Sequence, residues 1–293
     1  MTGLIVFVAY LAGFLVLAAS LYYPVLLAVT ALADVPPHKI LTRLGMLLAA
    51  GGLIFLLRRL RLNNREALGY DLARRPFLRS LAGGWLLGVA TMLIPLGAIF
   101  LLGVRGWRHS TIEAELLASA ALSGLFGGLA VGFIEETFFR GAMFTAVRRQ
   151  RGLVFTAVST AALYAALHFI KPHRLAPGEE PGWLTGFELL AGAFEQFSGS
   201  AMWDSFASLV LVGVFLALLR ERNGHIALAI GVHAGWVFAI KLAKTFTKSD
   251  PDAPLAWLIG HYDGITGWLV SAWLLVMIGV LLWMRSRGAG KTT

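Results

Sequence analysis

The stretch AELLASAALSGLFGGLAVGFIEETFFRGAMFTAV, residues 114–147, decides the fold, because a run this long and this apolar is not typical of a water-soluble domain. A helix needs about 20 apolar residues to cross roughly 30 Å of hydrocarbon. The whole chain has the same character: 58% of its 293 residues are hydrophobic, 14% are charged, and the mean hydropathy is +0.74. Further apolar runs lie at 4–32, 40–57, 79–104, 153–171, 203–220, 225–245 and 265–284. The sequence therefore predicts an all-α membrane protein of about eight transmembrane helices.

The basic residues indicate how these helices are oriented. They cluster at the ends of apolar runs, and the largest cluster lies in the loop 58–79. Cytoplasmic loops are enriched in Arg and Lys, and with eight spans every strong basic cluster lies on the same side. The pattern predicts that both termini are cytoplasmic, and it accounts for the formal charge of +9 without a nucleic-acid partner. The clusters contain Arg58, Arg59, Arg61, Arg65, Arg74, Arg75, Arg79, Arg148, Arg149, Arg151, Arg220, Arg222, Arg285, Arg287 and Lys291.

Three parts of the chain are expected to differ in role. Residues 1–110 hold the N-terminal transmembrane helices with the basic loop 58–79, residues 111–250 form a central part, and residues 251–293 hold the last helix and a basic tail. The N-terminus lacks the basic region and cleavage site of a signal peptide, so the first apolar run is expected to be retained. The chain has no cysteine, which excludes disulfides, thiolate catalysis and thiolate-bound zinc within it.

The least hydrophobic part of the chain is the loop 172–202, which opens with several prolines and glycines that interrupt a continuous helix. We expect this loop on the non-cytoplasmic side. Apolar residues within it recur at helical spacing opposite Glu188 and Glu195, which predicts a short amphipathic helix at the membrane interface. These apolar residues are Phe187, Leu190, Ala191 and Phe194. The role of the loop is left open.

Ionisable residues inside the apolar run 114–147 are the first candidates for chemistry. A charge in the middle of a span costs about 3 kcal/mol on insertion scales, so such residues invite a functional explanation. At 100° per residue, Glu136 and Arg140 lie about 40° apart and can neutralise each other. Glu135 lies about 140° from Arg140 by the same arithmetic, so it is left available. A free carboxylate near an apolar core suits a general base that acts on water, and Glu135 is the candidate base.

Two later apolar runs each contain a histidine well inside the run. These are His168, which follows Tyr164 by one helical turn, and His233. Imidazole can position a water, shuttle a proton or donate a hydrogen bond to an oxyanion. Each feature alone has a structural interpretation, as a hydrogen bond between packed helices or as a buried ion pair. Their occurrence on three separate runs instead favours one polar site in the core of the bundle.

The three motifs together resemble those of the CAAX-processing and bacteriocin-processing (CPBP or ABI) family of glutamate-dependent intramembrane proteases. The family signature is Glu-Glu-x-x-x-Arg, then aromatic-x-x-x-His, then His-x-x-x-Asn on successive membrane helices. In this sequence the three are EETFFR at 135–140, YAALH at 164–168 with tyrosine in the usual phenylalanine place, and HAGWV at 233–237. The resemblance covers about residues 114–245, which identifies the part 111–250 as a CPBP/ABI-like catalytic core.

The resemblance implies a role for each matched residue. By position, Glu135 and His168 would activate the water that attacks the scissile carbonyl. His233 would stabilise the oxyanion, and Glu136 with Arg140 would orient the site. The resemblance also implies a metal-free mechanism, so no cofactor is expected.

One position departs from the family pattern, since Val237 replaces the asparagine of the third motif. Valine has no hydrogen-bond donor, and the loss of one oxyanion donor typically costs about a hundredfold or more in rate. Three explanations stay open: a donor from another helix, a donor from the backbone, or a slow or inactive enzyme. The Trp236 indole N–H is a nearby donor but points about 100° away from Val237 on a regular helix. Tyr164 and Trp236 are expected to form an aromatic wall of the site.

Zinc is the chemical alternative at the same site, since one carboxylate and two histidines can hold it in an open three-ligand arrangement. The residues concerned are Glu135, His168 and His233. Their spacing is not that of the His-Glu-x-x-His helix that normally indicates zinc.

The leading functional hypothesis is an intramembrane endopeptidase that hydrolyses a peptide bond near the end of a membrane-associated protein or peptide. The alternative is a non-catalytic binding protein for self-immunity against a bacteriocin or for scaffolding, which Val237 favours. A secondary transporter would also place charges near the bilayer midplane, but the sequence lacks inverted repeats. The expected partners are a protein or peptide substrate and the lipid bilayer, and the expected location is a bacterial inner (plasma) membrane. The substrate and the oligomeric state are left open.

Overall fold

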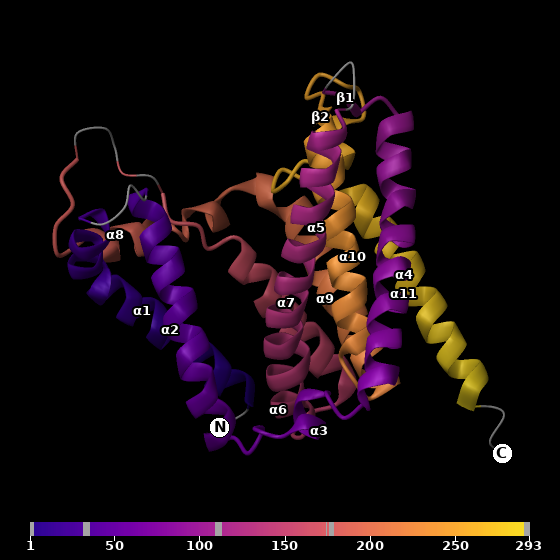
Figure 1. The fold of residues 1–293 in the computed structure, drawn as a ribbon, viewed down its shortest axis with the longest axis horizontal. Coiled ribbons are helices and arrows are strands. Elements are labelled where there is room, and N and C mark those ends of the chain that lie inside the picture. Colours follow the sequence, from indigo (N-terminus) through magenta and orange to yellow (C-terminus); the bar gives the residue numbers. More distant parts are fainter. Residues whose placement is uncertain (1–2, 32–35, 109–112, 174, 176–178, 290–293) are drawn as a thin grey trace. The chain divides into compact units, whose positions relative to one another are not determined.

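The computed structural model describes residues 3–31, 36–108, 113–173, 175 and 179–289, and in these ranges the chain is almost wholly helical (Figure 1). The helices are α1 (Gly3–Thr30), α2 (Pro37–Arg59), α3 (Arg65–Leu68), α4 (Arg74–Leu101), α5 (Ala114–Glu136), a π-helix (Thr137–Met143), α6 (Phe144–Arg148), α7 (Leu153–His168), α8 (Thr185–Gly192), α9 (Trp203–Asn223), α10 (Ala227–Phe246) and α11 (Trp268–Ala289). Short 3-10 turns lie at Glu195–Ser198, Ser200–Met202 and Ala256–Leu258, and two short strands are β1 (Arg105–Trp107) and β2 (Thr247–Ser249).

Seven of these helices are long and apolar enough to cross a membrane, namely α1, α2, α4, the continuous helix Ala114–Arg148, α9, α10 and α11. The predicted span 153–171 is the shorter helix α7. Large apolar side chains stay exposed on these helices, for example Phe55 at 74% and Leu101 at 87%, as expected for surfaces that lipid covers. The prediction of an all-α, multi-pass membrane protein is confirmed. The cytoplasmic placement of the termini stays a prediction, and Lys291 of the basic tail and the boundary between 110 and 111 lie outside the described residues.

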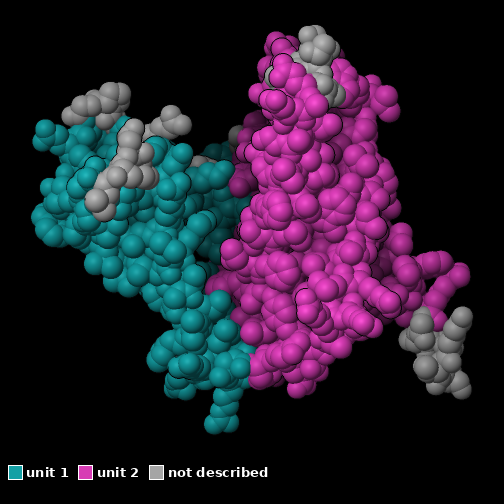
Figure 2. Space-filling model, in the orientation of Figure 1, with its two compact units in different colours: residues 1–63, 166–200 teal, residues 64–165, 201–293 magenta. Residues whose placement is uncertain are grey.

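The chain divides into two compact units, which Figure 2 shows in different colours. The first unit consists of residues 1–63 and 166–200, and the second of residues 64–165 and 201–293. The three predicted parts of the chain stay a prediction.

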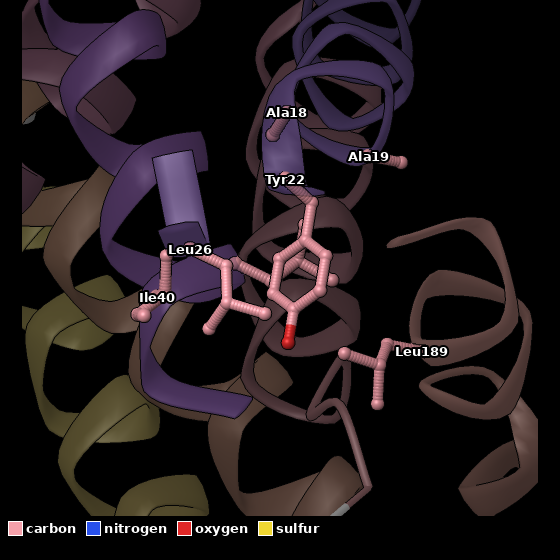
Figure 3. Close-up of a cluster of buried hydrophobic side chains, with 7 residues drawn as sticks. Ala18, Ala19, Tyr22, Leu26, Ile40 and Leu189 are labelled. Atoms are coloured by element: carbon pink, nitrogen blue, oxygen red, sulfur yellow. The ribbon is translucent and has the colours of Figure 1, made fainter. Parts of the chain in front are cut away.

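The first unit is held together by apolar contacts among α1, α2 and α8 (Figure 3). Gly186 of α8 lies so close to α1 that an added Cβ would be 2.2 Å from the Ala19 carbonyl oxygen. The short helix predicted in the loop 172–202 is therefore present, and it packs on α1 through Gly186 and Leu189, while Phe187 and Phe194 are exposed. Its position at a membrane interface stays a prediction. The buried cluster consists of Ala18, Ala19, Tyr22, Leu26, Ile40, Leu41 and Leu189.

The second unit contains α4, α5, α9, α10 and α11, and its polar contacts lie at the helix ends and in the core. The strands β1 and β2, which follow α4 and α10, pair antiparallel with Gly106 opposite Lys248. At the start of α9, the Ser208 hydroxyl donates to the Gly267 carbonyl at 2.6 Å and lies 2.7 Å from the Ser271 hydroxyl of α11. The sequence did not predict these strands, because each has only three residues next to a long apolar helix.

Candidate active site

The helix α10 lies in direct backbone contact with α4 and α5, and this contact fixes the position of His233. A Cβ added to Gly88 of α4 would lie 2.3 Å from the Val232 carbonyl oxygen, and one added to Gly128 of α5 would lie 2.7 Å from the Ala234 carbonyl oxygen. Small residues four apart allow membrane helices to approach this closely. The same close approach occurs at Gly84, Gly132, Gly231 and Gly235.

The end of α5 changes its geometry at the acidic pair of the first motif. From Thr137 to Met143 the helix is a π-helix, a form that often occurs at functional sites. The Thr137 hydroxyl donates to the Phe133 carbonyl at 2.5 Å and lies 2.6 Å from the Tyr70 hydroxyl. The sequence predicted one regular α-helix over 114–147, so this local widening corrects that expectation. The spacing of apolar residues in the sequence does not distinguish a short π-helix from the α-helix around it.

The predicted pair of Glu136 and Arg140 is confirmed and is buried. Arg140 Nη1 donates to Glu136 Oε1 at 2.9 Å, and the two side chains are 0% and 3% exposed, glutamate first. Arg140 Nη2 donates to the Gly213 carbonyl of α9 at 3.3 Å. A Cβ on Gly213 would lie 2.5 Å from the Ala161 Cβ of α7, so α7 and α9 also pack closely here. Arg140 thus connects the π-helix to α9 at the level of the acidic pair.

His233 of α10 lies against both glutamates. Its Nδ1 atom is 2.9 Å from Glu136 Oε1, and its Nε2 atom is 3.8 Å from Glu135 Oε2. The first distance is that of a hydrogen bond, and the second is too long for a direct one. Glu136 is the acceptor for Arg140, so the imidazole donates its Nδ1–H to the same carboxylate. The other ring nitrogen faces Glu135.

Glu135 is the more accessible of the two acids, with its side chain 26% exposed. Arg140 pairs with its neighbour Glu136, as the helical arithmetic predicted. The Oε2 atom of Glu135 is nevertheless buried and, like the Oε2 atom of Glu136, has no hydrogen-bond partner among the described residues. A buried carboxylate oxygen requires a polar partner, which a water or a polar group of a substrate can supply here.

The aromatic residue of the second motif, Tyr164, lies beside this cluster as expected. The Arg140 guanidinium carbon is 4.7 Å from the centre of the Tyr164 ring, and that ring meets His233 edge to face at 6.4 Å. His168 is one turn further and is the last residue of α7, where the chain has passed into the first unit. The proximity of His168 to Glu135, and with it the catalytic role of the second motif, therefore stays a prediction.

The tryptophan of the third motif makes contacts with α4 and α9, and its place with Tyr164 in an aromatic wall of the site stays a prediction. The Trp236 indole N–H donates to the Thr91 hydroxyl of α4 at 3.0 Å, and its ring packs against Phe215. This donor, considered above as a replacement for the missing asparagine, is thus already used in helix packing. Val237, one turn after His233, lines a groove between α5 and α10 together with Leu116.

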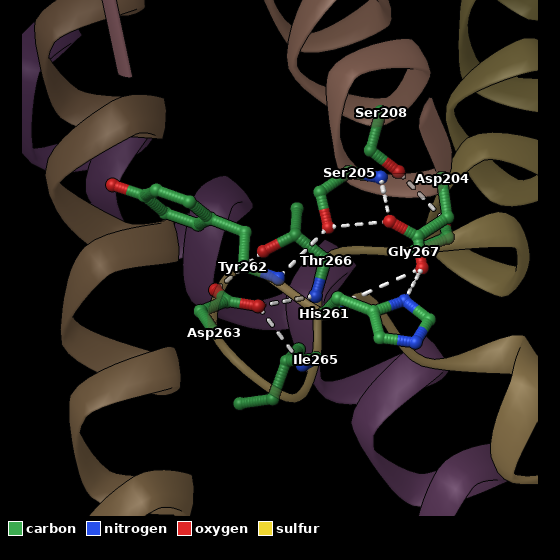
Figure 4. A network of polar contacts seen from close by, with 9 residues as sticks. All are labelled: Asp204, Ser205, Ser208, His261, Tyr262, Asp263, Ile265, Thr266 and Gly267. Carbon is green, nitrogen blue, oxygen red and sulfur yellow. Dashed lines mark hydrogen bonds and ion pairs between the residues drawn. The ribbon is translucent and has the colours of Figure 1, made fainter. Parts of the chain in front are cut away.

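Tyr262, in the loop between α10 and α11, is a further titratable residue that the sequence did not single out. Burial raises the pKa of Tyr262 to about 12, and the negative charges of Asp263 and Glu135 add to the rise. In Figure 4 the phenol ring points away from the hydrogen bonds that hold its backbone. No motif could have found this residue, because it lies more than 20 positions after the third motif in a loop without periodic pattern.

A metal would need several ligands at one point. Among the residues that the structure describes, no group of three or more His, Asp or Glu side chains is arranged to hold a metal ion. Glu136 is committed to Arg140 and His233, which leaves Glu135 and His233 as the donors that face each other. The expectation of a reaction without a cofactor stays a prediction.

Comparison with known proteins identifies the family that these motifs resemble. Residues 117–239 match the family described as type II CAAX prenyl endopeptidase Rce1-like, which confirms the predicted resemblance over this segment. No match was found among curated proteins or among solved structures. The matched segment contains all three motifs and Val237, whereas Tyr262 lies outside it.

Proposed function

We propose that this protein is an intramembrane endopeptidase in which Glu135 activates a water that attacks the peptide carbonyl. The observation that carries the proposal is that the two acids differ in their contacts. Glu136 is 0% exposed and accepts hydrogen bonds from Arg140 and His233, both at 2.9 Å, while the Glu135 side chain is 26% exposed, with Oε2 3.8 Å from His233 Nε2. The match to an endopeptidase family supports peptide-bond hydrolysis as the reaction.

The charges of the cluster support a hydrogen-bond donor at His233 Nε2. Glu135 and Glu136 carry two negative charges and Arg140 one positive charge, so the group balances when the imidazole carries both ring protons. A balanced cluster is favoured because an uncompensated charge away from water is costly. The doubly protonated ring donates Nδ1–H to Glu136 and points Nε2–H at the space beside Glu135.

The reaction then follows from these positions. Glu135 takes a proton from the water, and the resulting hydroxide forms a bond to the carbonyl carbon. The carbonyl oxygen becomes an oxyanion, which His233 Nε2–H stabilises. Protonated Glu135 gives its proton to the amide nitrogen, the C–N bond breaks, and a carboxylic acid and an amine are released. One water is consumed, and the side chains return to their starting state.

The substrate in this proposal is a protein or peptide that reaches the site from the membrane, and cleavage lies near one of its ends. His168 is proposed to help Glu135 position the water, as the family pattern implies. The proposed location is a bacterial inner membrane with the basic loop 58–79 in the cytoplasm, which the positive-inside rule supports.

One observation favours a second function. Val237 stands where the family has an asparagine, and it contributes no donor to an oxyanion. A non-catalytic binding protein that holds a peptide in the same site would tolerate this change, because binding needs no oxyanion stabilisation.

The two functions are separated by comparing the N- and C-terminal peptides of membrane proteins in cells that carry the wild-type protein, Glu135→Gln, or Glu115→Gln. Glu115 is an exposed acid in the first turn of the same helix, so its substitution controls for the loss of a charge. The proposal expects new termini with the wild type and Glu115→Gln and their loss with Glu135→Gln at equal protein abundance. Identical termini in all three strains would favour the binding function.

A further inference from the structure

Three basic side chains line the groove between α5 and α10 that contains Val237. We propose that this groove binds an anionic phospholipid, with the phosphate held by the basic side chains and an acyl chain lying along the apolar ones. The site lies wholly in the second unit and does not depend on the proposed peptidase function. The lining contains no acid and consists of Arg108, Lys241 and Lys244, with Leu116, Val237, Ile240 and Thr245.

The three cations are held at one end of the groove. Lys241 and Lys244 are three positions apart on α10, a spacing that places their side chains on the same face. The stem of Lys241 lies against α5, since a Cβ added to Gly124 would be 3.5 Å from both Cβ and Cγ of the lysine. The backbone N–H of Arg108 donates to the Phe246 carbonyl at 2.8 Å, which holds Arg108 next to the end of α10.

These charges are not neutralised within the described part of the chain. None of the three side chains forms an ion pair or a side-chain hydrogen bond there, and all three residues are exposed. Glu113 and Glu115, the acids at the start of α5, form no ion pair with them either. Like charges on one surface repel one another, so an anion that binds between them stabilises the arrangement.

The polarity of the groove changes along its length. Lys244 lies in the last turn of the span α10 and Lys241 in the turn before it, and basic side chains at the end of a span reach the headgroup region. Val237 lies about two turns before Lys244, which is about 10 Å deeper along the helix axis. The groove is therefore charged at the depth of the lipid headgroups and apolar at the depth of the acyl chains.

The three cations also lie at the end of the spans where basic residues are less expected. α4 leads from the basic loop 58–79 to β1, and β1 pairs with β2 directly after α10, so the end of α10 lies opposite that loop (Figure 1). Basic residues that determine orientation cluster on the cytoplasmic side, which is the predicted side of the loop 58–79. The cations of the groove need another reason for their position, and the binding of an anionic headgroup supplies one.

A peptide with a C-terminal carboxylate is the other ligand with a charged end and an apolar body. Peptide N–H and C=O groups require hydrogen-bond partners away from water, and the side chains of Leu116, Val237 and Ile240 offer none. An acyl chain has no such groups to satisfy. Val237 stands where the family pattern has an asparagine, so this departure removes a polar side chain from the deep part of the groove. The lining therefore favours the lipid over the peptide.

The test measures how much each of four ligands raises the thermal unfolding temperature of the purified, delipidated full-length protein in detergent. The ligands are dioleoyl phosphatidylglycerol, dioleoyl phosphatidylcholine, inorganic phosphate and a short apolar peptide with a free C-terminal carboxylate. A ligand that binds only the folded protein raises this temperature with its concentration, which yields an apparent Kd. We expect the tightest binding for phosphatidylglycerol, because it alone combines a net negative headgroup with acyl chains.

Substitutions then locate the site. Lys241→Gln with Lys244→Gln should weaken phosphatidylglycerol binding by about twentyfold, at about fivefold for each cation removed. Lys241→Arg with Lys244→Arg keeps both charges and should bind as the wild type does. The matched control for Lys244→Gln is Lys248→Gln, because Lys248 is an exposed lysine of the neighbouring strand β2 outside the groove. Ile240→Asn places a polar side chain in the apolar part and should weaken binding of the lipid while leaving that of phosphate unchanged.

Several results would overturn the inference. Equal binding of phosphatidylglycerol and phosphatidylcholine would show that the charge is not recognised, and phosphate binding as tight as the lipid would show that the acyl chain is not. Tighter binding of the peptide would assign the groove to a peptide. Equal losses for Lys244→Gln and Lys248→Gln would place the lipid elsewhere. None of these measurements involves cleavage, so this inference and the proposed function stand or fall separately.

Discussion

His233 Nδ1 and Arg140 Nη1 reach the same oxygen, Oε1 of Glu136, each at 2.9 Å. This shared acceptor joins α10 to the π-helix. Because Arg140 also donates to the backbone of α9, one carboxylate oxygen connects three elements of the second unit. The acid of the first motif that connects these elements is therefore Glu136, whereas Glu135 makes no such connection and is the acid proposed to act on water.

The substitution Glu136→Gln tests this structural role. It leaves Arg140 as an uncompensated buried charge, a change that typically costs about 3–5 kcal/mol of unfolding free energy. We expect a clear drop in the thermal unfolding temperature of the purified protein in detergent. Glu221→Gln is the matched control, since Glu221 pairs with Arg148 at 2.9 Å on the surface, where such pairs contribute up to about 1 kcal/mol. Equal shifts for the two variants would contradict the role assigned to Glu136.

Two glycines of α4 test the close packing of α10. Gly88→Ala introduces a Cβ 2.3 Å from the Val232 carbonyl oxygen, so α10 has to move and His233 with it. We expect lower stability and slower cleavage of the mapped peptide, which spans the cleavage site identified by the comparison of membrane-protein termini. Gly97→Ala on the same helix meets no atom within 4 Å and should be neutral or stabilise by up to about 1 kcal/mol. A Gly88→Ala protein as active and as stable as Gly97→Ala would show that the contact is not needed.

The role of the second motif is tested by replacing His168 and, as a control, His173, which both lie in the first unit. His168→Ala should slow cleavage by about a hundredfold or more if His168 helps to position the water, since general acid–base groups contribute at least that factor. His173→Ala is the control, because His173 is exposed and pairs with Glu195 at 3.1 Å. The initial rates of peptide cleavage decide the matter, and equal rates for both variants would remove His168 from the mechanism.

The raised pKa of Tyr262 predicts that its contribution to stability declines at alkaline pH. Its pKa is near 10 in an unfolded chain and about 12 in the folded protein, so its contribution is present in full below pH 10. As the pH rises from 10 to 12, the unfolded chain loses this proton more readily and the contribution declines. Unfolding of the wild type followed over this range should therefore depend more steeply on pH than that of Tyr262→Phe. Parallel pH curves for the two proteins would contradict the burial of this hydroxyl.

The spans and the acidic pair were predictable because they depend on local sequence. Long apolar runs determine helices in lipid, and the spacing of four between Glu136 and Arg140 places them on one face whatever surrounds them. The angle of 100° per residue also predicted that Arg140 pairs with Glu136 and not with Glu135. The glycines at 124, 128 and 132 also recur every four residues. The sequence alone does not show that the helix they face is α10.

The remaining features depend on contacts between distant segments. The hydrogen bond of His233 to Glu136 joins residues 97 positions apart, and that of Arg105 to Gly264 joins residues 159 positions apart. No local period indicates such pairings. The loop of Tyr262 was missed for this reason, since its position depends on hydrogen bonds to Ser205 of α9 and Arg105 of β1.

The most direct test of the central claim is the turnover of the purified protein and of Glu135→Gln on the mapped peptide at equal folded concentration. If Glu135 activates the attacking water, the substitution should abolish cleavage, with a loss of at least about a hundredfold, while peptide binding is retained. Turnover by Glu135→Gln at a rate similar to that of the wild type would contradict the account.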